Sequence, residues 1–263
     1  MDANTPLLFF DSGVGGLSVL EPTRALLPTA PIVYVADSAG YPYGTKTEEE
    51  IASRVPPLLG RLVQRFQPRL VVIACNTACT IALDHVRAEL DIPVVGTVPA
   101  IKPAAEMTKT KAIGVLGTEA TIRQPYVDDL TRRFASGCTV IRHGSPELVA
   151  IAEAKLRGGP ISVDEVRAAA APLFAGADGE RIDVVVLACT HFPLLREELE
   201  RAYPGRQWVD GGAGIARRIR YLARDQSWPN TYPGGTAVFT GGLPPESLLN
   251  VLGHYGLQQV QAL

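Results

Sequence analysis

The 263-residue sequence lacks several features that would place it in a special class of protein. Its longest apolar runs, such as 70–75 and 184–189, fall far short of the roughly 20 residues that cross a bilayer, so we expect no membrane span. No basic stretch precedes the apolar residues 7–10, which argues against a signal peptide and predicts a cytoplasmic protein. With 25 basic and 27 acidic residues, the net charge of −2 does not favour nucleic acid or an anionic membrane as a partner.

Cysteine is also scarce. Four cysteines are too few for a disulfide framework in a chain of this length, which leaves packing, metal binding or catalysis as their roles. Cys75 and Cys79 do not have the C-x-x-C spacing, and no second pair of ligands follows at the spacing of a zinc finger. We therefore expect no metal site and assign Cys79 and Cys138 to packing.

Short apolar runs rich in β-branched residues alternate with longer segments of helical period. This alternation predicts an α/β fold of mainly parallel sheets flanked by helices. The expected strands cover residues 7–10, 32–36, 70–74, 112–116, 184–188, 207–209 and 237–240. One apolar helix face consists of Leu58, Leu59, Leu62, Val63 and Phe66. Capping-box spacing predicts helix starts at Thr45–Glu48 and Ser162–Glu165.

An internal repeat predicts two related halves. Residues 71–77 resemble residues 185–191, which lie 114 positions later. Residues 8–13 resemble residues 114–119 more weakly, at an offset of 106 positions. Any two buried strands look alike, but that does not explain a cysteine at the same place in both. We therefore expect two pseudo-symmetric α/β domains, residues 1–98 plus 207–263 and residues 99–206, with the active site between them.

Polar turns follow the expected strands. Ligands of open α/β sheets bind outside the carboxyl ends of the strands. The turns there contain Ser, Thr, Asn and Gly but no Lys or Arg, and they cover residues 11–16, 41–44, 75–77, 117–121 and 189–191. Such turns suit a small zwitterion held by hydrogen bonds. The glycine run 13–16 lacks the complete G-x-G-x-x-G pattern and follows Asp11, which disfavours a dinucleotide loop.

Cys75 and Cys189 end apolar strands, and each is expected to begin a helix. A helix N-terminus lowers the pKa of a thiol from about 8.5, so the pattern predicts reactive thiols. A matched pair at related strand ends favours chemistry over packing. His191 and Asp11 are the nearest polar partners, and Asp11 can also cap a helix. The other histidines, expected on the surface or on helix faces, are His85, His143 and His254.

Five segments together resemble the glutamate racemases, within the cofactor-independent aspartate/glutamate racemases. The segments are 10–17, 42–44, 74–78, 117–121 and 189–195, in the order and spacing of that family, and residues 239–242 resemble its end. The resemblance spans nearly the whole chain. It implies a two-domain fold, no cofactor, and conversion of L-glutamate to the D-glutamate of bacterial peptidoglycan and the cell wall.

The resemblance also implies roles for individual residues. Cys75 and Cys189 match the catalytic thiols, Asp11 and His191 match the residues that assist them, and Glu153 matches a further catalytic carboxylate. The segment around Glu153 departs from the family pattern. The implied substrate-binding residues are Asp11, Ser12, Pro42, Tyr43, Gly44, Asn76, Thr77, Thr118, Thr121, Thr190 and His191.

Racemisation needs a base on one face of the α-carbon and an acid on the other. Two opposed thiols supply both, about 7 Å apart if each reacting pair of atoms is about 3 to 3.5 Å apart. A pyridoxal enzyme would need a Schiff-base lysine, but the five lysines lie outside the polar turns. A two-thiol racemase of aspartate or another small acid, and a non-catalytic binding or inhibitory protein, stay as alternatives. A homodimer is compatible with the sequence, which does not decide the oligomeric state.

Overall fold

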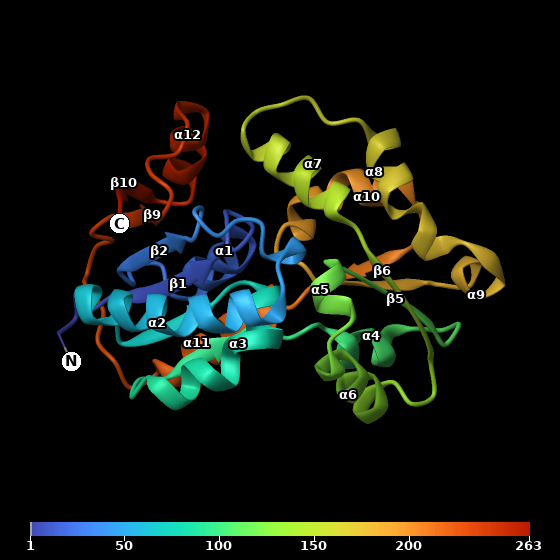
Figure 1. Cartoon of the computed structure of the whole chain (residues 1–263), viewed down its shortest axis with the longest axis horizontal. Coiled ribbons are helices and arrows are strands. Elements are labelled where there is room, and N and C mark those ends of the chain that lie inside the picture. The colour runs from blue at the N-terminus through green and yellow to red at the C-terminus, as the bar shows by residue number, and fades with distance from the viewer. Residues whose placement is uncertain (1) are drawn as a thin grey trace. The chain divides into compact units, whose positions relative to one another are not determined.

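The computed structural model describes residues 2–263, which form two compact units (Figure 1). Unit 1 runs to Thr97 and resumes over Gly212–Leu263, and unit 2 is Val98–Gly211. The second boundary was expected at 206/207. It lies at 211/212 instead, because strand β8 (Gln207–Val209) pairs with β7 (Val184–Leu187) of unit 2.

Unit 1 contains a six-stranded sheet in the order β10-β9-β2-β1-β3-β4, and every pair of neighbours is parallel. Its strands are β1 (Leu7–Asp11), β2 (Ile32–Ala36), β3 (Leu70–Ile73), β4 (Val94–Gly96), β9 (Gly235–Phe239) and β10 (Leu257–Ala262). β4 and β10, the two edge strands of this sheet, were not among the strands expected from the sequence. β4 has only three residues, and β10 reads Leu-Gln-Gln-Val-Gln-Ala with little apolar signal.

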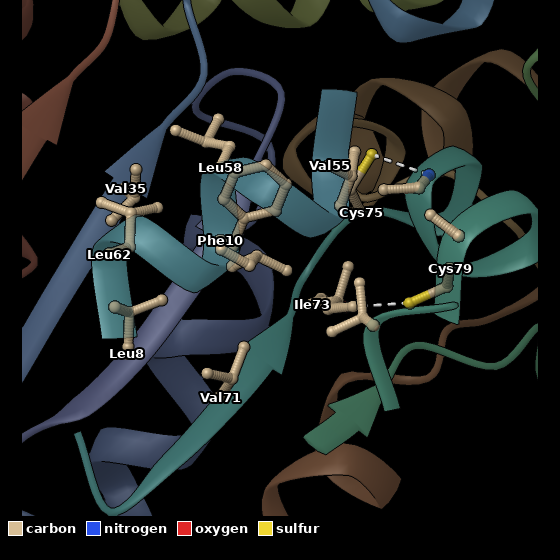
Figure 2. Packing of buried hydrophobic residues seen from close by; sticks show 14 of the residues in the cluster. Leu8, Phe10, Val35, Val55, Leu58, Leu62, Val71, Ile73, Cys75 and Cys79 are labelled. Atoms are coloured by element: carbon tan, nitrogen blue, oxygen red, sulfur yellow. Dashed lines mark hydrogen bonds between the residues drawn. The ribbon is translucent and has the colours of Figure 1, made fainter. Parts of the chain in front are cut away.

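In unit 1, helices pack against the sheet and form the core with it. The helices are α1 (Leu17–Leu26), η1 (Tyr43–Thr45), α2 (Glu48–Phe66), α3 (Asn76–Glu89), α11 (Gly212–Leu222) and α12 (Glu246–His254). Alternate strand residues such as Phe10 and Val71 belong to one buried cluster with Leu58 and Leu62 of α2 (Figure 2). The predicted apolar face of α2 is therefore confirmed.

The predicted start of α2 was wrong by two residues. Thr47 caps the helix, and Glu50 completes a capping box with it. Thr45 is the last residue of the 3-10 turn η1, which precedes the helix. In unit 2, Ser162 caps its helix as predicted, because its hydroxyl accepts the N–H of Glu165 at 3.4 Å.

Unit 2 contains a four-stranded parallel sheet in the order β6-β5-β7-β8, built from β5 (Ala112–Gly117), β6 (Thr139–Gly144), β7 and β8. Its helices are α4 (Ile101–Met107), α5 (Glu119–Ile122), α6 (Pro125–Phe134), α7 (Pro146–Leu156), α8 (Val163–Ala170), η2 (Ala171–Phe174), α9 (Gly176–Glu180), η3 (Phe192–Leu195) and α10 (Arg196–Ala202). Ile113 and Val186 of the sheet pack with Ile101 and Val127 of the helices.

The two units repeat one strand order, since β2-β1-β3-β4 in unit 1 corresponds to β6-β5-β7-β8 in unit 2. Leu7 pairs with Leu70, and Ile113 pairs with Val184, which reproduces the offsets of 106 and 114 found in the sequence. In each sheet the second strand pairs with one side of the first strand, and the third strand pairs with its other side. The carboxyl ends of the first and third strands therefore form the switch point where α/β sheets bind ligands.

Within residues 2–263, no helix combines the length and the hydropathy that crossing a membrane requires.

Candidate functional site

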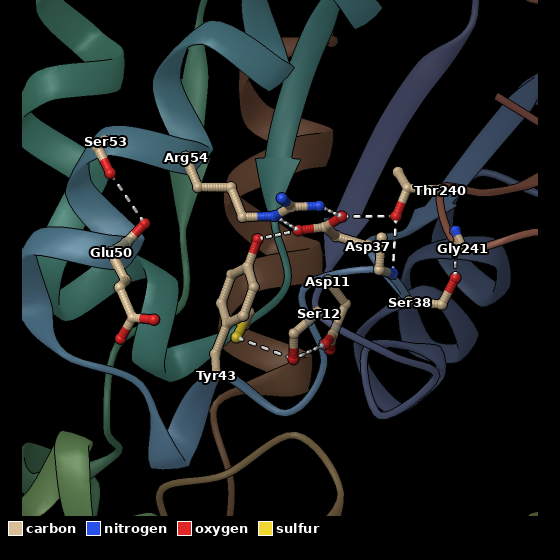
Figure 3. Close-up of polar contacts among 12 residues, drawn as sticks. Asp11, Ser12, Asp37, Ser38, Tyr43, Glu50, Ser53, Arg54, Thr240 and Gly241 are labelled. Atoms are coloured by element: carbon tan, nitrogen blue, oxygen red, sulfur yellow. Dashed lines mark hydrogen bonds and ion pairs between the residues drawn. The ribbon is translucent and has the colours of Figure 1, made fainter.

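The switch point of unit 1 joins a thiol to a carboxylate. Asp11 ends β1 with a side chain that is completely buried, and Cys75 follows β3. The thiol of Cys75 donates to Oγ of Ser12 at 3.8 Å, and the hydroxyl of Ser12 donates to Oδ1 of Asp11 at 3.2 Å (Figure 3). Cys75, Ser12 and Asp11 thus form a chain of thiol, hydroxyl and carboxylate.

Cys75 is the N-cap of α3, as the sequence predicted, but the predicted lowering of its pKa was wrong. Its sulfur accepts the N–H of Ala78 at 3.5 Å (Figure 2). Burial nevertheless raises the pKa of the Cys75 thiol well above its usual value, and the negative charge of Asp11 raises it further. Near neutral pH, Cys75 is therefore a protonated thiol.

Asp11 does not cap a helix, contrary to one of the two roles expected for it. The N-cap of α1 is Gly16, five residues later, and it forms no side-chain bond. Oδ1 of Asp11 instead accepts the N–H of Gly13 at 2.9 Å. A Cβ at Gly16 would lie 2.9 Å from Oδ2 of Asp11 and 2.9 Å from the hydroxyl of Tyr34, so only glycine lets α1 begin this close to the carboxylate.

The loop containing Pro42, Tyr43 and Gly44 follows β2. Tyr43 is 1% exposed and belongs to the same buried cluster as Cys75. Its hydroxyl donates to Oδ2 of Asp37 at 2.5 Å. Burial raises the pKa of Tyr43 far above its usual value, and the charge of Asp37 adds to the effect, so the phenol stays protonated.

In unit 2, Cys189 follows β7 and lies beside an imidazole. Nδ1 of His191 is 3.9 Å from Sγ of Cys189, and Nε2 of His191 is 2.8 Å from Oε1 of Glu153 on α7. An ionised carboxylate only accepts hydrogen bonds, so Nε2 donates to Glu153, and in the neutral ring the lone pair of Nδ1 then faces the thiol. Arg157 binds the other oxygen of Glu153 at 3.3 Å.

Cys189 does not begin an α-helix, in contrast to the expectation. The 3-10 turn η3 starts at Phe192, and α10 begins only at Arg196. Pro193 has no N–H to donate, so it fits the first turn of η3, where its N–H would have no partner in the turn.

The remaining candidates lie in the same polar turns. Thr118 caps α5, because its Oγ1 accepts the N–H of Thr121 at 3.1 Å, and its hydroxyl donates to Oγ1 of Thr121 at 2.9 Å. The candidates that are buried at the strand ends are Ser12, Asn76, Thr77, Thr118, Thr121 and Thr190.

The other cysteines and histidines take no part in the contacts that link these thiols to their carboxylates. Cys79 donates to the carbonyl of Ile73 at 3.1 Å (Figure 2). It also accepts the N–H of Thr97 at 3.1 Å, so it forms hydrogen bonds as well as packing in the core. Cys138 is half-buried against the core of unit 2. His85 and His254 are exposed on helices as expected, whereas His143 lies half-buried on β6. Among the described residues, no group of three or more His, Cys, Asp and Glu side chains is placed to hold a metal ion.

Several side chains that surround these turns were not predicted from the sequence. The carboxylate of Asp37 accepts hydrogen bonds from Arg54 and Thr240 beside Tyr43, and Glu153 accepts one from Arg157. The side chains of Arg54 and Thr240 come from elements 17 and 203 positions from Asp37, so no local spacing indicated them. Arg157 was detectable in principle, because it lies four positions after Glu153 on the same helical face.

Comparison with known proteins places this geometry in a family. Residues 18–219 match the model of the Asp/Glu/hydantoin racemase family. The glutamate racemase of Sphingopyxis alaskensis is 63% identical over 99% of this chain and 98% of that protein. The glutamate racemase of Klebsiella pneumoniae is 43% identical over 100% of this chain and 93% of that protein.

A solved structure is similar as well. The crystal structure of Escherichia coli glutamate racemase, in complex with L-glutamate and the activator UDP-MurNAc-Ala, matches with a TM-score of 0.90 at 42% identity, over 98% of each chain. These matches show that the chain belongs to the Asp/Glu/hydantoin racemase family of isomerases and, within it, to the glutamate racemases.

Proposed function

We propose that the protein interconverts L-glutamate and D-glutamate by a two-base mechanism in which Cys75 and Cys189 exchange the roles of acid and base. One observation carries the proposal: each thiol is linked to a buried carboxylate through a single polar group. Ser12 links Cys75 to Asp11, and His191 links Cys189 to Glu153. A thiol that gives up or takes a proton needs such a partner.

In the direction that starts from L-glutamate, the thiolate of Cys189 takes the α-proton, and the electron pair of the C–H bond stays on the α-carbon. Cys75 then donates its thiol proton to the opposite face of that carbon, which completes D-glutamate and leaves a thiolate on Cys75. The reverse direction uses Cys75 as the base. The raised pKa of Cys75, which keeps the proton on its sulfur, supports its role as the acid for L-glutamate.

His191 and Asp11 assist one thiol each in this scheme. Nδ1 of His191 accepts the proton of Cys189, and Glu153 keeps the imidazole in the tautomer that permits this. Asp11 acts on Cys75 through Ser12. The ammonium group of the substrate brings a positive charge that offsets the effect of Asp11 and favours the Cys75 thiolate when Cys75 must act as a base.

The polar turns bind the substrate and stabilise the carbanion. Backbone N–H groups at the start of α3 and the buried hydroxyls of Thr118, Thr121 and Thr190 are the donors that we assign to the carboxylates. The presence of L-glutamate in the similar E. coli structure supports glutamate over aspartate. We also propose that the product serves peptidoglycan synthesis, the role that the family resemblance implies.

Chiral chromatography of L-glutamate incubated with the pure protein tests the proposal directly. The sample is first treated with a chelator and receives no pyridoxal phosphate. We expect D-glutamate to form until the two enantiomers are equal, and aspartate to react far more slowly, because a shorter substrate leaves buried donors unpaired. Comparable rates on aspartate would favour the alternative two-thiol racemase, and activity that needs pyridoxal phosphate would overturn the mechanism.

A further inference from the structure

A buried carboxylate behind the Tyr43 loop collects hydrogen bonds from three separate elements. Asp37 follows β2, and its side chain is completely buried. Its two oxygens accept from Nε and Nη2 of Arg54 on α2 at 2.5 and 2.6 Å, from the hydroxyl of Tyr43 at 2.5 Å, and from the hydroxyl of Thr240 after β9 at 2.6 Å (Figure 3). Bidentate pairing with arginine is both strong and directional, so the network has one geometry.

The same network holds the intervening loop at several backbone positions. Oγ1 of Thr240 accepts the N–H of Ala39 at 3.0 Å, and Oγ of Ser38 accepts the N–H of Gly241 at 2.9 Å (Figure 3). The N–H of Gly40 donates to the carbonyl of Asp37 at 2.9 Å. The loop that leads to Tyr43 is therefore tied to two neighbouring strands.

Packing leaves no space for a side chain at Gly40 in this loop. A Cβ at Gly40 would lie 2.5 Å from Oδ2 of Asp37, 2.6 Å from Nε of Arg54 and 2.9 Å from Cε1 of Tyr43. The hydroxyl of Tyr43 is committed to Asp37, and the residue lies in the buried cluster that also contains Cys75. Tyr43 therefore contributes a fixed ring and backbone to the site and takes no part in proton transfer.

We propose that Asp37 and Arg54 are positioning residues that hold Pro42, Tyr43 and Gly44 in the conformation that binds the substrate. The inference rests on the proposed function, because it takes this loop as part of the glutamate site. The network around Asp37 sets the affinity for glutamate and leaves the proton-transfer steps unchanged. Neither Asp37 nor Arg54 needs to touch the substrate for this role.

The test compares Arg54→Ala with Arg61→Ala, an exposed arginine on the same helix. We expect Arg54→Ala to raise KM for both enantiomers by about tenfold or more, the effect of losing charged hydrogen bonds, with kcat within about threefold of wild type. Guanidinium at millimolar concentration should restore part of the affinity. Arg61→Ala should change neither constant. A fall in kcat at unchanged KM, or no change in either constant, would overturn the inference.

Two further measurements keep the test decisive. Circular dichroism and thermal unfolding verify the fold, and if Arg54→Ala does not fold, Thr240→Val removes one neutral donor and should raise KM in the same way. Calorimetry gives the dissociation constant of D-glutamate without turnover. A wild-type protein that binds D-glutamate but does not racemise it contradicts the proposed function alone, whereas equal binding by wild type and Arg54→Ala contradicts the positioning role alone. If the wild type neither binds nor racemises glutamate, both proposals fail.

Discussion

The two units share one strand order and one pair of thiols, but they place different groups beside each thiol. In unit 1 the link to the carboxylate is Ser12, which follows the first strand, whereas in unit 2 it is His191, which follows the third strand with Cys189 itself. The topology decides where each thiol lies, and the residues just beyond the strand ends decide what assists it. A hydroxyl next to a carboxylate favours a protonated thiol, while the lone pair of an imidazole can accept its proton.

The strongest test of this comparison removes each thiol in turn. Cys75→Ser and Cys189→Ser should each lower kcat by about a thousandfold or more, since a hydroxyl is far less acidic than a thiol and an acid or base step is lost. In deuterated water, the Cys75→Ser variant should still exchange the α-proton of L-glutamate slowly, and the Cys189→Ser variant that of D-glutamate. Chiral chromatography and proton NMR measure the two outcomes.

Cys79→Ser and Cys138→Ser are the matched controls, since both thiols lie outside the proposed acid and base steps. They should keep kcat within about tenfold of wild type. Full racemisation by either single variant at Cys75 or Cys189 would show that this thiol is not a required acid or base.

Substituting the assisting groups should separate the two units. Asp11→Asn and His191→Asn should each lower kcat by about a hundredfold, the usual contribution of one acid or base. The pH profile distinguishes them. Because the charge of Asp11 raises the pKa of Cys75, its removal should move the rising acid limb of kcat/KM for D-glutamate to lower pH, even though the maximum falls.

The matched measurement uses L-glutamate, for which Cys189 is the base. Asp11→Asn should leave the position of that acid limb unchanged. Glu153→Gln should lower kcat/KM for L-glutamate more than kcat/KM for D-glutamate. A limb that moves to higher pH with D-glutamate would contradict the electrostatic role of Asp11.

Acid stability should differ between the units, because Asp37 in unit 1 corresponds to the uncharged Ser145 in unit 2. The two positions are equivalent because the N–H of Asp37 donates to the carbonyl of Asp11, the last residue of β1. In the same way, the N–H of Ser145 donates to the carbonyl of Gly117, the last residue of β5. Burial alone would raise the pKa of Asp37, but the hydrogen bonds from Arg54, Thr240 and Tyr43 outweigh it and hold the pKa below its usual value. A lowered pKa stabilises the fold above the unfolded pKa of about 3.9, and this stabilisation is lost as the pH falls through the folded value.

Urea unfolding of the wild type and of Asp37→Asn over a series of pH values measures this loss. The free energy of unfolding should fall less steeply with acid in the variant, because its amide does not titrate. Identical acid dependence in the two proteins would show that Asp37 is not a source of the acid sensitivity.

The smallest expected effects concern the helix caps. Thr47→Ala in unit 1 and Ser162→Ala in unit 2 should each lower the free energy of unfolding by about 1 kcal/mol, since each removes an oxygen that accepts backbone N–H groups. Thr45→Ala, at the position that sequence spacing had indicated, should cost less than about 0.5 kcal/mol, as a typical surface change does. Urea denaturation measures all three, and an equal cost at Thr45 and Thr47 would contradict the observed cap.

The sequence alone was sufficient to locate the central strands and the thiols at their ends. Buried parallel strands read as continuous apolar runs, and the repeat between residues 71–77 and 185–191 survived because both segments fill the same place in the two sheets. The edge strands β4, β6 and β10 were missed, since a short or half-exposed strand carries little apolar signal. The candidate residues of the polar turns were named from the sequence, but Arg54, Thr240 and Arg157 behind them were not.

Only the tertiary structure decided the pKa values and the hydrogen-bond partners of the residues at the site. Cys75 begins a helix as predicted, yet its pKa is raised, because burial and the nearby charge of Asp11 outweigh the N–H of Ala78. Arg54 and Thr240 reach Asp37 only after three distant elements have folded together. Desolvation and Coulomb energies depend on everything that surrounds a group, and that surrounding comes from parts of the chain that no local pattern connects.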